Sequence, residues 1–412
     1  MAAGFSAVVA LCALQLLRQA GTPSWQSIWA EDGSVYATDA LNVGAAATLF
    51  RGYAGYVQFL PRALALSVRL VPVRRASVVL AVLASLCCAL LALFVYRCTE
   101  RWIDSMALRL LAAATVAVLP ASYLETTANI ANLGWPLLVA TFWAILSREE
   151  LVSDTVLRCV VVALTALSTT VAVLLAPLAL GAAWYRRRRR DWTVAATFGV
   201  ALAVQLALDR SAGPAPPRSP NSAADIPEVF GVRVLGSIAF GERWLGDVWS
   251  SLHFWLIPVA ILLLAIVVLL AVRDASRERR WFAVAGLGFA FVLFVVPVWI
   301  RGTGAMHLSG ESLNINAPRY VIAPIAVAFS ALLVVVDASR RRWLRYVVVA
   351  QAVLVIAICF RMPSARSDAE PWSAEVDHAA QQCRDQPSLT RVRLPISPGP
   401  PWTVVVPCER VR

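Results

Sequence analysis

Trp29-Ala30-Glu31-Asp32-Gly33 lies between the first long apolar run of the sequence and all the later ones. Its two adjacent carboxylates, Glu31 and Asp32, stand out because acidic residues beside a bilayer are costly and are usually kept there for a function. Gly33 permits a tight backbone turn behind them. We interpret the stretch as a catalytic loop just outside a membrane. The alternative is that Asp32 only caps a short surface helix that begins near Ser34.

The composition is that of an all-α polytopic membrane protein. Of the 412 residues, 59% are hydrophobic and only 15% are charged. Several apolar runs approach the roughly 20 residues that a helix needs to cross a bilayer. The net charge of +12 does not indicate nucleic acid, because the arginines fall in short clusters between apolar runs, as in cytoplasmic loops. Membrane lipids are therefore expected as partners and nucleic acid is not.

We expect about 11 transmembrane helices in residues 1–360 and a polar tail in residues 361–412. The apolar region 155–185 is long for one helix, and Ser168-Thr169-Thr170 divides it, so we expect two short helices there. The other expected spans are 3–17, 76–96, 108–123, 135–146, 192–208, 252–272, 281–300, 320–336 and 345–360.

The arginine clusters also predict the orientation in the cell membrane. With the N-terminus in the cytoplasm, every dense cluster falls on the cytoplasmic side, and the first loop (18–75) and the C-terminal tail fall outside. Arg74 and Arg75 are the exception, because they lie on the outer side. The cytoplasmic clusters are 97–109, 186–190, 273–280 and 340–345.

The first outer loop is expected to contain two short juxtamembrane helices, at 34–49 and 61–70. In the second of these, Arg62 and Arg69 share one face and apolar residues take the other, which is typical of a helix lying in the interface. Between the two helices, Gly52-Tyr53-Ala54-Gly55-Tyr56 predicts a turn.

Polar side chains from distant parts of the chain collect on this predicted outer face. They suit transfer from a lipid-linked phosphate, since arginines neutralise the leaving phosphate and a carboxylate accepts the proton of an acceptor hydroxyl. No P-loop, GxGxxG or zinc signature is present. The candidate residues are Glu31, Asp32, Arg62, Glu125, Asn129, Asn132, His307 and Arg319.

Several candidates also have a purely structural interpretation, which the sequence leaves open. Arg319, beside Tyr320, is then a head-group anchor, and Arg62 contacts anionic lipid. Asn129 and Asn132 satisfy backbone groups at a helix–helix turn. His307 is an ordinary loop residue.

The layout resembles the GT-C glycosyltransferases, which are integral membrane enzymes that use polyprenyl-phosphate sugars on the outer face. The resemblance rests on the acidic pair after the first helix, the juxtamembrane helices of the first loop and a second acidic link on the same side. More narrowly, the chain is similar to actinobacterial membrane proteins with this architecture. The similar segments are Trp29-Ala30-Glu31-Asp32-Gly33, Gly55-Tyr56 with Leu60-Pro61-Arg62, and Pro318-Arg319-Tyr320.

This resemblance implies an inverting hexosyl- or pentosyltransferase. The donor substrate would be a polyprenyl-phosphate sugar, and the acceptor a glycan, lipid or protein of the cell envelope. Asp32 matches the general base, with Glu31 as the alternative, and Glu125 matches the second acidic site, beside Asn129 and Asn132. The usual paired acids are missing at Glu125, which leaves a divalent metal undecided. Arg319 matches the donor-phosphate position, where Arg62 and His307 are further candidates.

Two other functions remain open. A transporter or flippase of a lipid-linked glycan should carry ionisable residues deep inside several helices. The main deep polar residues here are Gln205 and Gln351, which favours an enzyme over a flippase. A non-catalytic envelope assembly protein would not depend on Asp32.

The tail contains Cys383 and Cys408 in a segment that the topology places in an oxidising compartment. We predict a disulfide between them, a helix at 377–383 and paired strands at 390–394 and 404–406. Such a small unit needs a staple, because burial alone cannot hold it. The alternative is two free thiols in a disordered tail.

Overall fold

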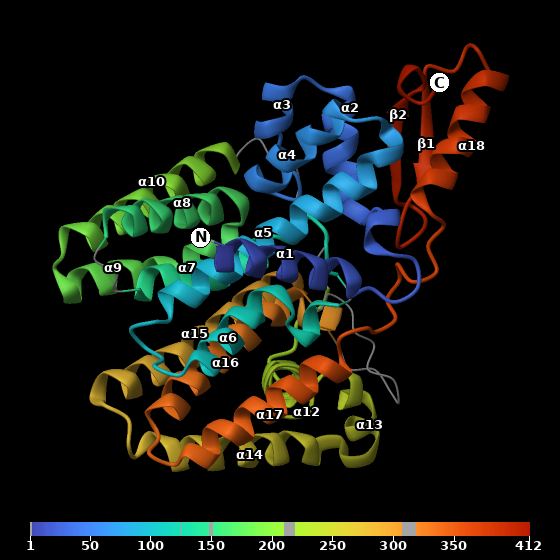
Figure 1. Cartoon of the computed structure of the whole chain (residues 1–412). Helices are drawn as coiled ribbons and strands as arrows, with labels where there is room; N and C mark the ends of the chain where they lie inside the picture. The colour runs from blue at the N-terminus through green and yellow to red at the C-terminus, as the bar shows by residue number, and fades with distance from the viewer. Residues whose placement is uncertain (1, 124, 148–150, 210–218, 307–318) are drawn as a thin grey trace.

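The computed structural model describes residues 2–123, 125–147, 151–209, 219–306 and 319–412. It is a bundle of helices with one small antiparallel hairpin at its edge (Figure 1). The α-helices and strands are α1 (Ala2–Leu17), α2 (Thr38–Asn42), α3 (Ala45–Phe50), α4 (Phe59–Ala65), α5 (Ala76–Cys98), α6 (Met106–Ala117), α7 (Gly134–Leu146), α8 (Val152–Ser168), α9 (Ala176–Arg186), α10 (Arg189–Asp209), α11 (Asp225–Phe230), α12 (Ser237–Phe240), α13 (Glu242–Leu252), α14 (Leu256–Val272), α15 (Arg277–Arg301), α16 (Arg319–Ala338), α17 (Arg342–Ile358), α18 (Trp372–Asp385), β1 (Arg391–Pro395) and β2 (Thr403–Pro407).

The chain is a multi-pass membrane protein. Among the described residues, four helical stretches are long and apolar enough to cross a bilayer: Val73–Cys98, Arg189–Leu208, Arg277–Arg301 and Arg319–Ala338. Further apolar helices, such as Gly134–Leu146, are shorter than the usual span. The count of about 11 spans and the orientation therefore stay predictions.

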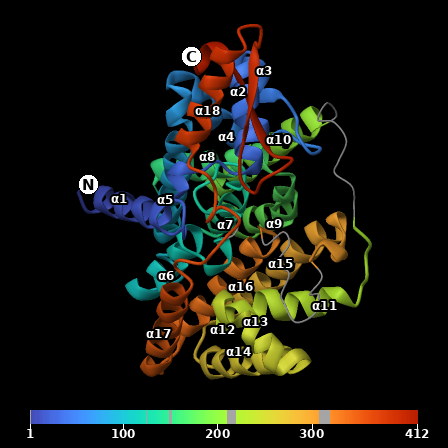
Figure 2. The ribbon, with the colours of Figure 1, turned by 90° about the vertical axis from the view of Figure 1, so that its right-hand side faces the viewer.

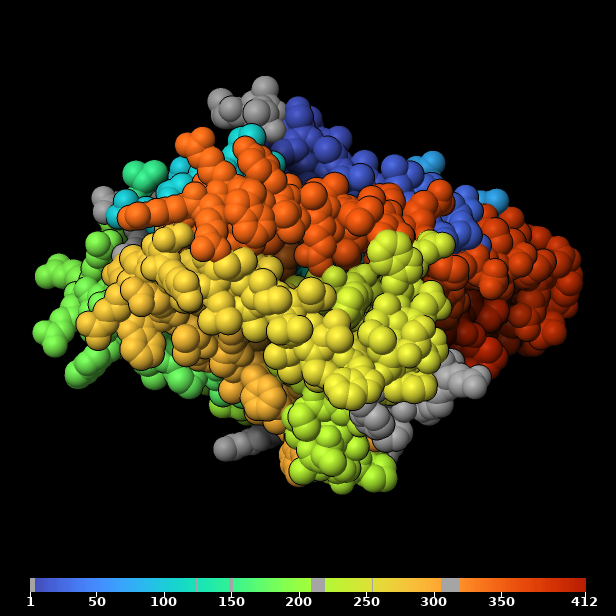
Figure 3. Space-filling view, turned by 90° about the horizontal axis from the view of Figure 1, so that it is seen from below, coloured from blue at the N-terminus to red at the C-terminus, as the bar shows by residue number. Residues whose placement is uncertain are grey.

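The centre of the bundle is formed by α7 and α16. Almost every residue of both helices is apolar and buried, so neither helix needs a water-facing side. The fully buried Trp143 of α7 donates its indole N–H to Ser330 of α16 at 3.3 Å. α15 packs along α16, and α8 and α10 form a layer to one side (Figures 1 and 2). α14 and α17 cover the underside (Figure 3).

Two boundaries depend on single residues. The helix expected at 108–123 ends at Ala117, because Pro120 disfavours helical backbone at the residue before it, and Leu119 is extended (φ −54°, ψ 128°). The expected division of 155–185 is confirmed. α8 ends at Ser168, and the Thr169 side chain accepts the N–H of Val171 to begin a 3-10 segment that leads into α9.

The helices of the first loop are shorter than expected. A π-helical turn, Asp32–Ala37, runs into α2, and the chain becomes extended at Val43. The single helix predicted at 34–49 is therefore wrong. Asn42 explains the break, because its amide donates to Thr38 O and to Val405 O of β2, both at 2.8 Å. The helix expected at 61–70 begins earlier, as α4, and ends as a 3-10 helix at Leu70.

The prediction for the tail is confirmed. Cys383 and Cys408 are joined by a disulfide, and α18 packs beside the β1–β2 hairpin. The tail also shares a hydrophobic core with the first loop, which the sequence did not predict. Gly33 is the point of closest approach, since a Cβ there would lie 2.5 Å from Ile396 Cδ1 and 2.6 Å from Val404 Cγ2. Gly33 is thus needed for packing rather than for a turn.

Candidate functional site

Segments far apart in the sequence meet at one end of the bundle. The first loop, the link between α6 and α7, the start of α16 and the tail contact one another there. The first loop, this link and the tail therefore share one face, whichever compartment it occupies. The tail also accounts for the exceptional Arg74, which pairs with Asp377 of α18.

Asp32 is buried, at 2% exposure, and both of its carboxylate oxygens are occupied. Oδ1 accepts the N–H of Ala131 at 2.8 Å and Oδ2 accepts that of Ile130 at 3.0 Å. Burial raises the pKa of Asp32 to about 7, against the lowering effects of these hydrogen bonds and of Arg366. Asp32, in the first loop, thus holds the link between α6 and α7, which contains Glu125 and Asn129.

Glu31 is in a different environment from its neighbour. It is half-buried, and no described residue donates a hydrogen bond to its carboxylate. Its charge acts on Tyr53, Tyr56 and Arg319, and it contributes to the raised pKa of both tyrosines, for which burial is the larger cause. Glu31 is therefore a carboxylate without a structural partner beside an arginine and two phenols.

Glu125 and Arg319 form the charged pair of this site. The Glu125 carboxylate accepts the backbone N–H of Arg319 at 3.3 Å and lies 3.4 Å from its Nη1. The side chains are partly exposed, at 16% and 25%. Burial raises the pKa of Glu125, although Arg319 opposes this shift. Arg319 is the first residue of α16, so its charge adds to the positive end of that helix.

Asn129 and Asn132 hold the backbone of the link. Both side-chain amides donate to the carbonyl of Glu125, in the case of Asn132 at 2.9 Å. The Asn129 side-chain oxygen in turn accepts the N–H of Asn132 at 3.1 Å. Both asparagines are buried. Their contacts satisfy backbone groups and position Glu125, as expected if the two residues have a structural role.

The remaining predicted phosphate ligands do not join this cluster. Arg62 is fully buried in the first loop, where its Nη1 donates to Asp39 at 2.9 Å and to Thr48 O at 3.1 Å. Its guanidinium also lies 5.4 Å from the centre of the Tyr36 ring. His307 lies outside the described residues.

The described residues do not fit a divalent metal. Mg²⁺ and Ca²⁺ sites are built from several oxygen ligands. Within the described ranges no group of three or more His, Cys, Asp or Glu residues is placed to hold a metal ion. Glu125 is already engaged by Arg319, which leaves Glu31 as a single carboxylate.

Sequence reasoning missed Arg366 and assigned no role to Tyr53 and Tyr56. Arg366 comes from the tail and is 3% exposed. It donates to Ser24 O, Ser27 O and Thr127 O at 2.9–3.2 Å, which ties three segments together under Asp32. A lone arginine in a polar tail gives no signal of this role. Tyr53 and Tyr56 could have been recognised from the sequence, because they lie on either side of the predicted turn at Ala54-Gly55.

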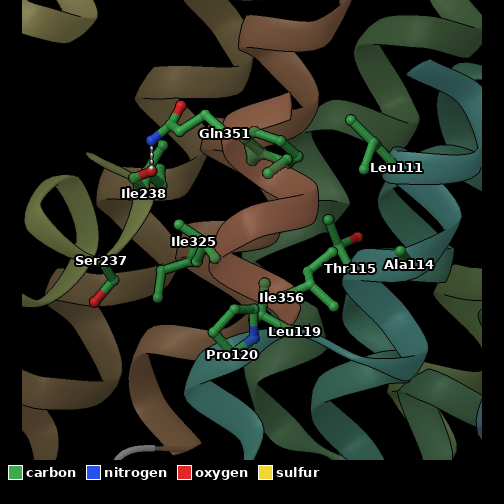
Figure 4. Close-up of a pocket in the computed structure, with 13 residues that line it drawn as sticks. Leu111, Ala114, Thr115, Leu119, Pro120, Ser237, Ile238, Ile325, Gln351 and Ile356 are labelled. Atoms are coloured by element: carbon green, nitrogen blue, oxygen red, sulfur yellow. Dashed lines mark hydrogen bonds between the residues drawn. The ribbon is translucent and has the colours of Figure 1, made fainter. Parts of the chain in front are cut away.

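Two cavities lie away from these charges. One, of about 50 Å³, is lined mainly by apolar residues of α6, α12, α16 and α17, with Thr115, Ser237 and Gln351 as polar lining residues, and the Gln351 amide donates to Ile238 O at 3.0 Å (Figure 4). It contains no ionisable side chain. The other, of about 320 Å³, lies between the tail and the first loop and includes Glu370 and Glu375. Neither includes Glu31, Glu125 or Arg319.

Comparisons with known proteins give only a distant likeness. No protein-family model and no curated protein sequence matches the chain. Among solved structures it is similar to the oligosaccharyltransferase of Archaeoglobus fulgidus in complex with zinc and sulfate, with a TM-score of 0.41 and 14% identity over 93% of this chain and 56% of that one. The same enzyme tethered to an acceptor peptide with the NVT sequon gives a TM-score of 0.40 and 13% identity, over 93% and 57% of the two chains. The chain thus spans little more than half the length of these structures.

Proposed function

We propose that the protein is a GT-C-type membrane glycosyltransferase. It moves a sugar from a polyprenyl-phosphate donor to an acceptor hydroxyl on the outer face of the cell membrane. One observation carries the proposal: Glu31, Glu125 and Arg319, from three distant segments, lie together at the end of the apolar helix α16. The phosphate of a membrane lipid lies at the membrane surface, where the ends of membrane-spanning helices also lie.

Arg319 is assigned to the donor phosphate. The N-terminus of a helix attracts anions, and a guanidinium can bind a phosphate with two parallel hydrogen bonds. The Glu125 carboxylate contacts only Nη1 of the Arg319 side chain, at distances of 3.4–3.5 Å. Glu125 therefore aims the arginine and leaves other N–H groups for phosphate oxygens.

Glu31 is assigned as the general base. The acceptor oxygen attacks the anomeric carbon from the face opposite the phosphate, and Glu31 takes the hydroxyl proton as the new C–O bond forms. The bond between the anomeric carbon and the phosphate oxygen breaks, and the electron pair leaves with the phosphate, which Arg319 stabilises. The configuration at that carbon is inverted.

Asp32 is given a positioning role instead of the role of base that its match to the family suggested. A base must approach the acceptor hydroxyl within hydrogen-bond reach. Both oxygens of Asp32 are occupied by backbone N–H groups, whereas Glu31, the alternative base, is half-buried and accepts no hydrogen bond from a described residue.

The test compares Glu31→Gln with Asp32→Asn in purified protein. Transfer is measured with mannosyl, glucosyl and arabinosyl polyprenyl phosphates and envelope acceptor extract, and thermal unfolding is measured in detergent. Glu31→Gln should lower transfer by about 10²–10⁴-fold and leave the unfolding midpoint unchanged. Asp32→Asn should lower the midpoint, because its amide cannot accept from both N–H groups, but should retain transfer per folded molecule.

If Asp32→Asn abolishes transfer without lowering the unfolding midpoint, and Glu31→Gln retains transfer, Asp32 is the general base. Wild-type transfer by both variants would end the catalytic assignment. A wild-type protein that transfers none of the sugars but moves lipid-linked glycan between the leaflets of vesicles would be a flippase.

A further inference from the structure

The turn Gly52–Tyr56 is held in an unusual backbone conformation. Tyr53 and Tyr56 exchange backbone hydrogen bonds of 3.0 and 3.2 Å across it. Ala54 and Gly55 both have positive φ, at 55° and 92°. This pair of conformations is the type I′ pattern of a tight hairpin. The left-handed region is strained for an alanine, and such strain concentrates at functional sites.

The turn is fixed to the membrane helices just beyond it. Gln205 of α10 donates to Val57 O at 2.9 Å, and Ser168 of α8 accepts the N–H of Leu60 at 3.1 Å. These contacts define where the two tyrosines lie relative to the bundle. The segment that follows the turn is therefore attached to α8 and α10.

The pairing puts both phenol rings on one face of the turn. Residues directly opposite each other in an antiparallel pair project to the same face. Tyr53 and Tyr56 are both half-buried. The charges of Glu31 and Arg319 act on the pKa of both hydroxyls, in opposite directions. Tyr320 extends the aromatic surface, because Arg319 lies 5.4 Å from its ring centre. Trp135 stands edge-on to Tyr320, also at 5.4 Å.

Aromatic rings beside a carboxylate and an arginine match the chemistry of a sugar. A sugar ring has apolar C–H faces, which pack on aromatic rings, and hydroxyl edges, which bind charged and phenolic groups. Burial raises the pKa of Tyr53, so its hydroxyl keeps its proton at neutral pH and can donate to a sugar oxygen.

We propose that Tyr53 and Tyr56 form the donor-sugar subsite, with the ring of Tyr53 against a C–H face of the sugar while Arg319 binds the phosphate. The inference rests on the proposed function, since it assumes a lipid-phosphate sugar as substrate. It adds the residues that distinguish a sugar-bearing lipid phosphate from the spent lipid phosphate.

The test measures how much the sugar adds to the affinity of a lipid phosphate for the protein, which we call the sugar increment. Binding of farnesyl phosphate and of its mannosyl, glucosyl and arabinosyl esters is measured by calorimetry on the full chain in detergent. Wild-type protein should bind at least one ester about tenfold more tightly than farnesyl phosphate. Tyr53→Leu, which keeps apolar volume but removes the ring, should abolish this increment and leave the affinity for farnesyl phosphate unchanged. Tyr53→Phe should restore most of it.

The matched control is Tyr96→Leu, another half-buried tyrosine with an arginine 4.3 Å from its ring centre, near the C-terminal end of α5. It should leave all affinities unchanged. An intact increment in folded Tyr53→Leu would overturn the sugar subsite, because a tyrosine that only anchors the loop at the membrane surface predicts this result. Wild-type binding of farnesyl phosphate without any increment would overturn it too, with the phosphate site intact. Wild-type failure to bind any probe would overturn the proposed function itself.

Discussion

Two arginine–carboxylate pairs, one at each end of α7, show how differently the same groups can be used. At one end Arg158 and Asp191 form a buried pair, called the sealed pair below, with 2% and 6% side-chain exposure and 2.8 Å between Arg158 Nη2 and Asp191 Oδ1. Arg158 also donates to Ala144 O at 2.7 Å. At the other end the Glu125 and Arg319 side chains are partly exposed and 3.4 Å apart, and the charge of Glu31, which has no hydrogen-bond donor among the described residues, acts on Arg319.

The difference teaches that burial of a charge does not by itself mark a functional site. Arg158 and Asp191 have their donors and acceptors matched within the protein, so they contribute to structure and leave nothing for a ligand. The pair at the other end is loose, and its surroundings include a carboxylate and phenols with spare capacity. The predictions below test whether this contrast holds.

The largest effect is expected at the sealed pair. Asp191→Asn leaves Arg158 buried without its counter-charge, which should lower the free energy of unfolding by about 3–5 kcal/mol. Transfer per folded molecule should stay at the wild-type level. Glu100→Gln is the control, because Glu100 is 61% exposed in its pair with Arg109 and should cost less than about 1 kcal/mol. Thermal unfolding in detergent provides both values, and equal losses would remove the contrast.

Next in size is the disulfide that joins α18 to the end of the hairpin within the tail. Replacing Cys383 and Cys408 by serine opens a loop with a sequence separation of 25 residues. In the chain-entropy model the loss is about 3 kcal/mol. Cys159→Ser, which removes a half-buried free thiol, is the control. Unfolding with and without reductant measures the effect. A double variant as stable as the wild type would show that the core shared with the first loop holds the tail alone.

The pH dependence of stability tests the role of Asp32. Its native pKa of about 7 lies above the ordinary value of 3.8, so the native state binds more protons than the unfolded state between these pH values. The contribution of Asp32 is therefore fully present below pH 3.8 and is lost as the pH rises through about 7. The unfolding midpoint of the wild type should fall more between pH 5 and pH 8 than that of Asp32→Asn. Parallel profiles would contradict the shift.

The smallest effect is expected for Arg319→Lys. The charge is kept but the planar fork is lost, so the donor concentration required for half-maximal transfer should rise about tenfold. Stability should change by less than about 1 kcal/mol, because the pair is partly exposed. Steady-state kinetics over donor concentration measure this. Unchanged donor dependence would leave Arg319 as a head-group anchor at the membrane surface.

The sequence predicted the parts of the fold that depend on local pattern. Apolar runs predicted the positions of the long apolar helices α5, α10, α15 and α16, and Ser168-Thr169-Thr170 predicted the division between α8 and α9. In the tail, the two cysteines and the alternation of Val392 and Leu394 gave the staple and the hairpin. These features need only neighbouring residues.

The details of the site depend on residues far away in the chain, and this is where prediction from the sequence stopped. Glu31 and Asp32 are adjacent and chemically alike, and what distinguishes them is the deeper burial of Asp32 and the N–H groups of Ile130 and Ala131 that it accepts. The break after Asn42 depends on a carbonyl of β2. Arg366 could not be recognised, because its partners come from two other segments.

The position of the tail has a consequence for biosynthesis. The backbone next to the acidic pair is completed by residues near the other end of the sequence, since Ala30 donates its N–H to Ser397 O at 2.6 Å and Gly33 lies under Ile396 and Val404. A ribosome makes the first loop early and these partners late. The loop must therefore wait, with its apolar side uncovered, until the tail is made and docks. Glu31 and Asp32 therefore reach their final environment only after residues 396–404 have been made.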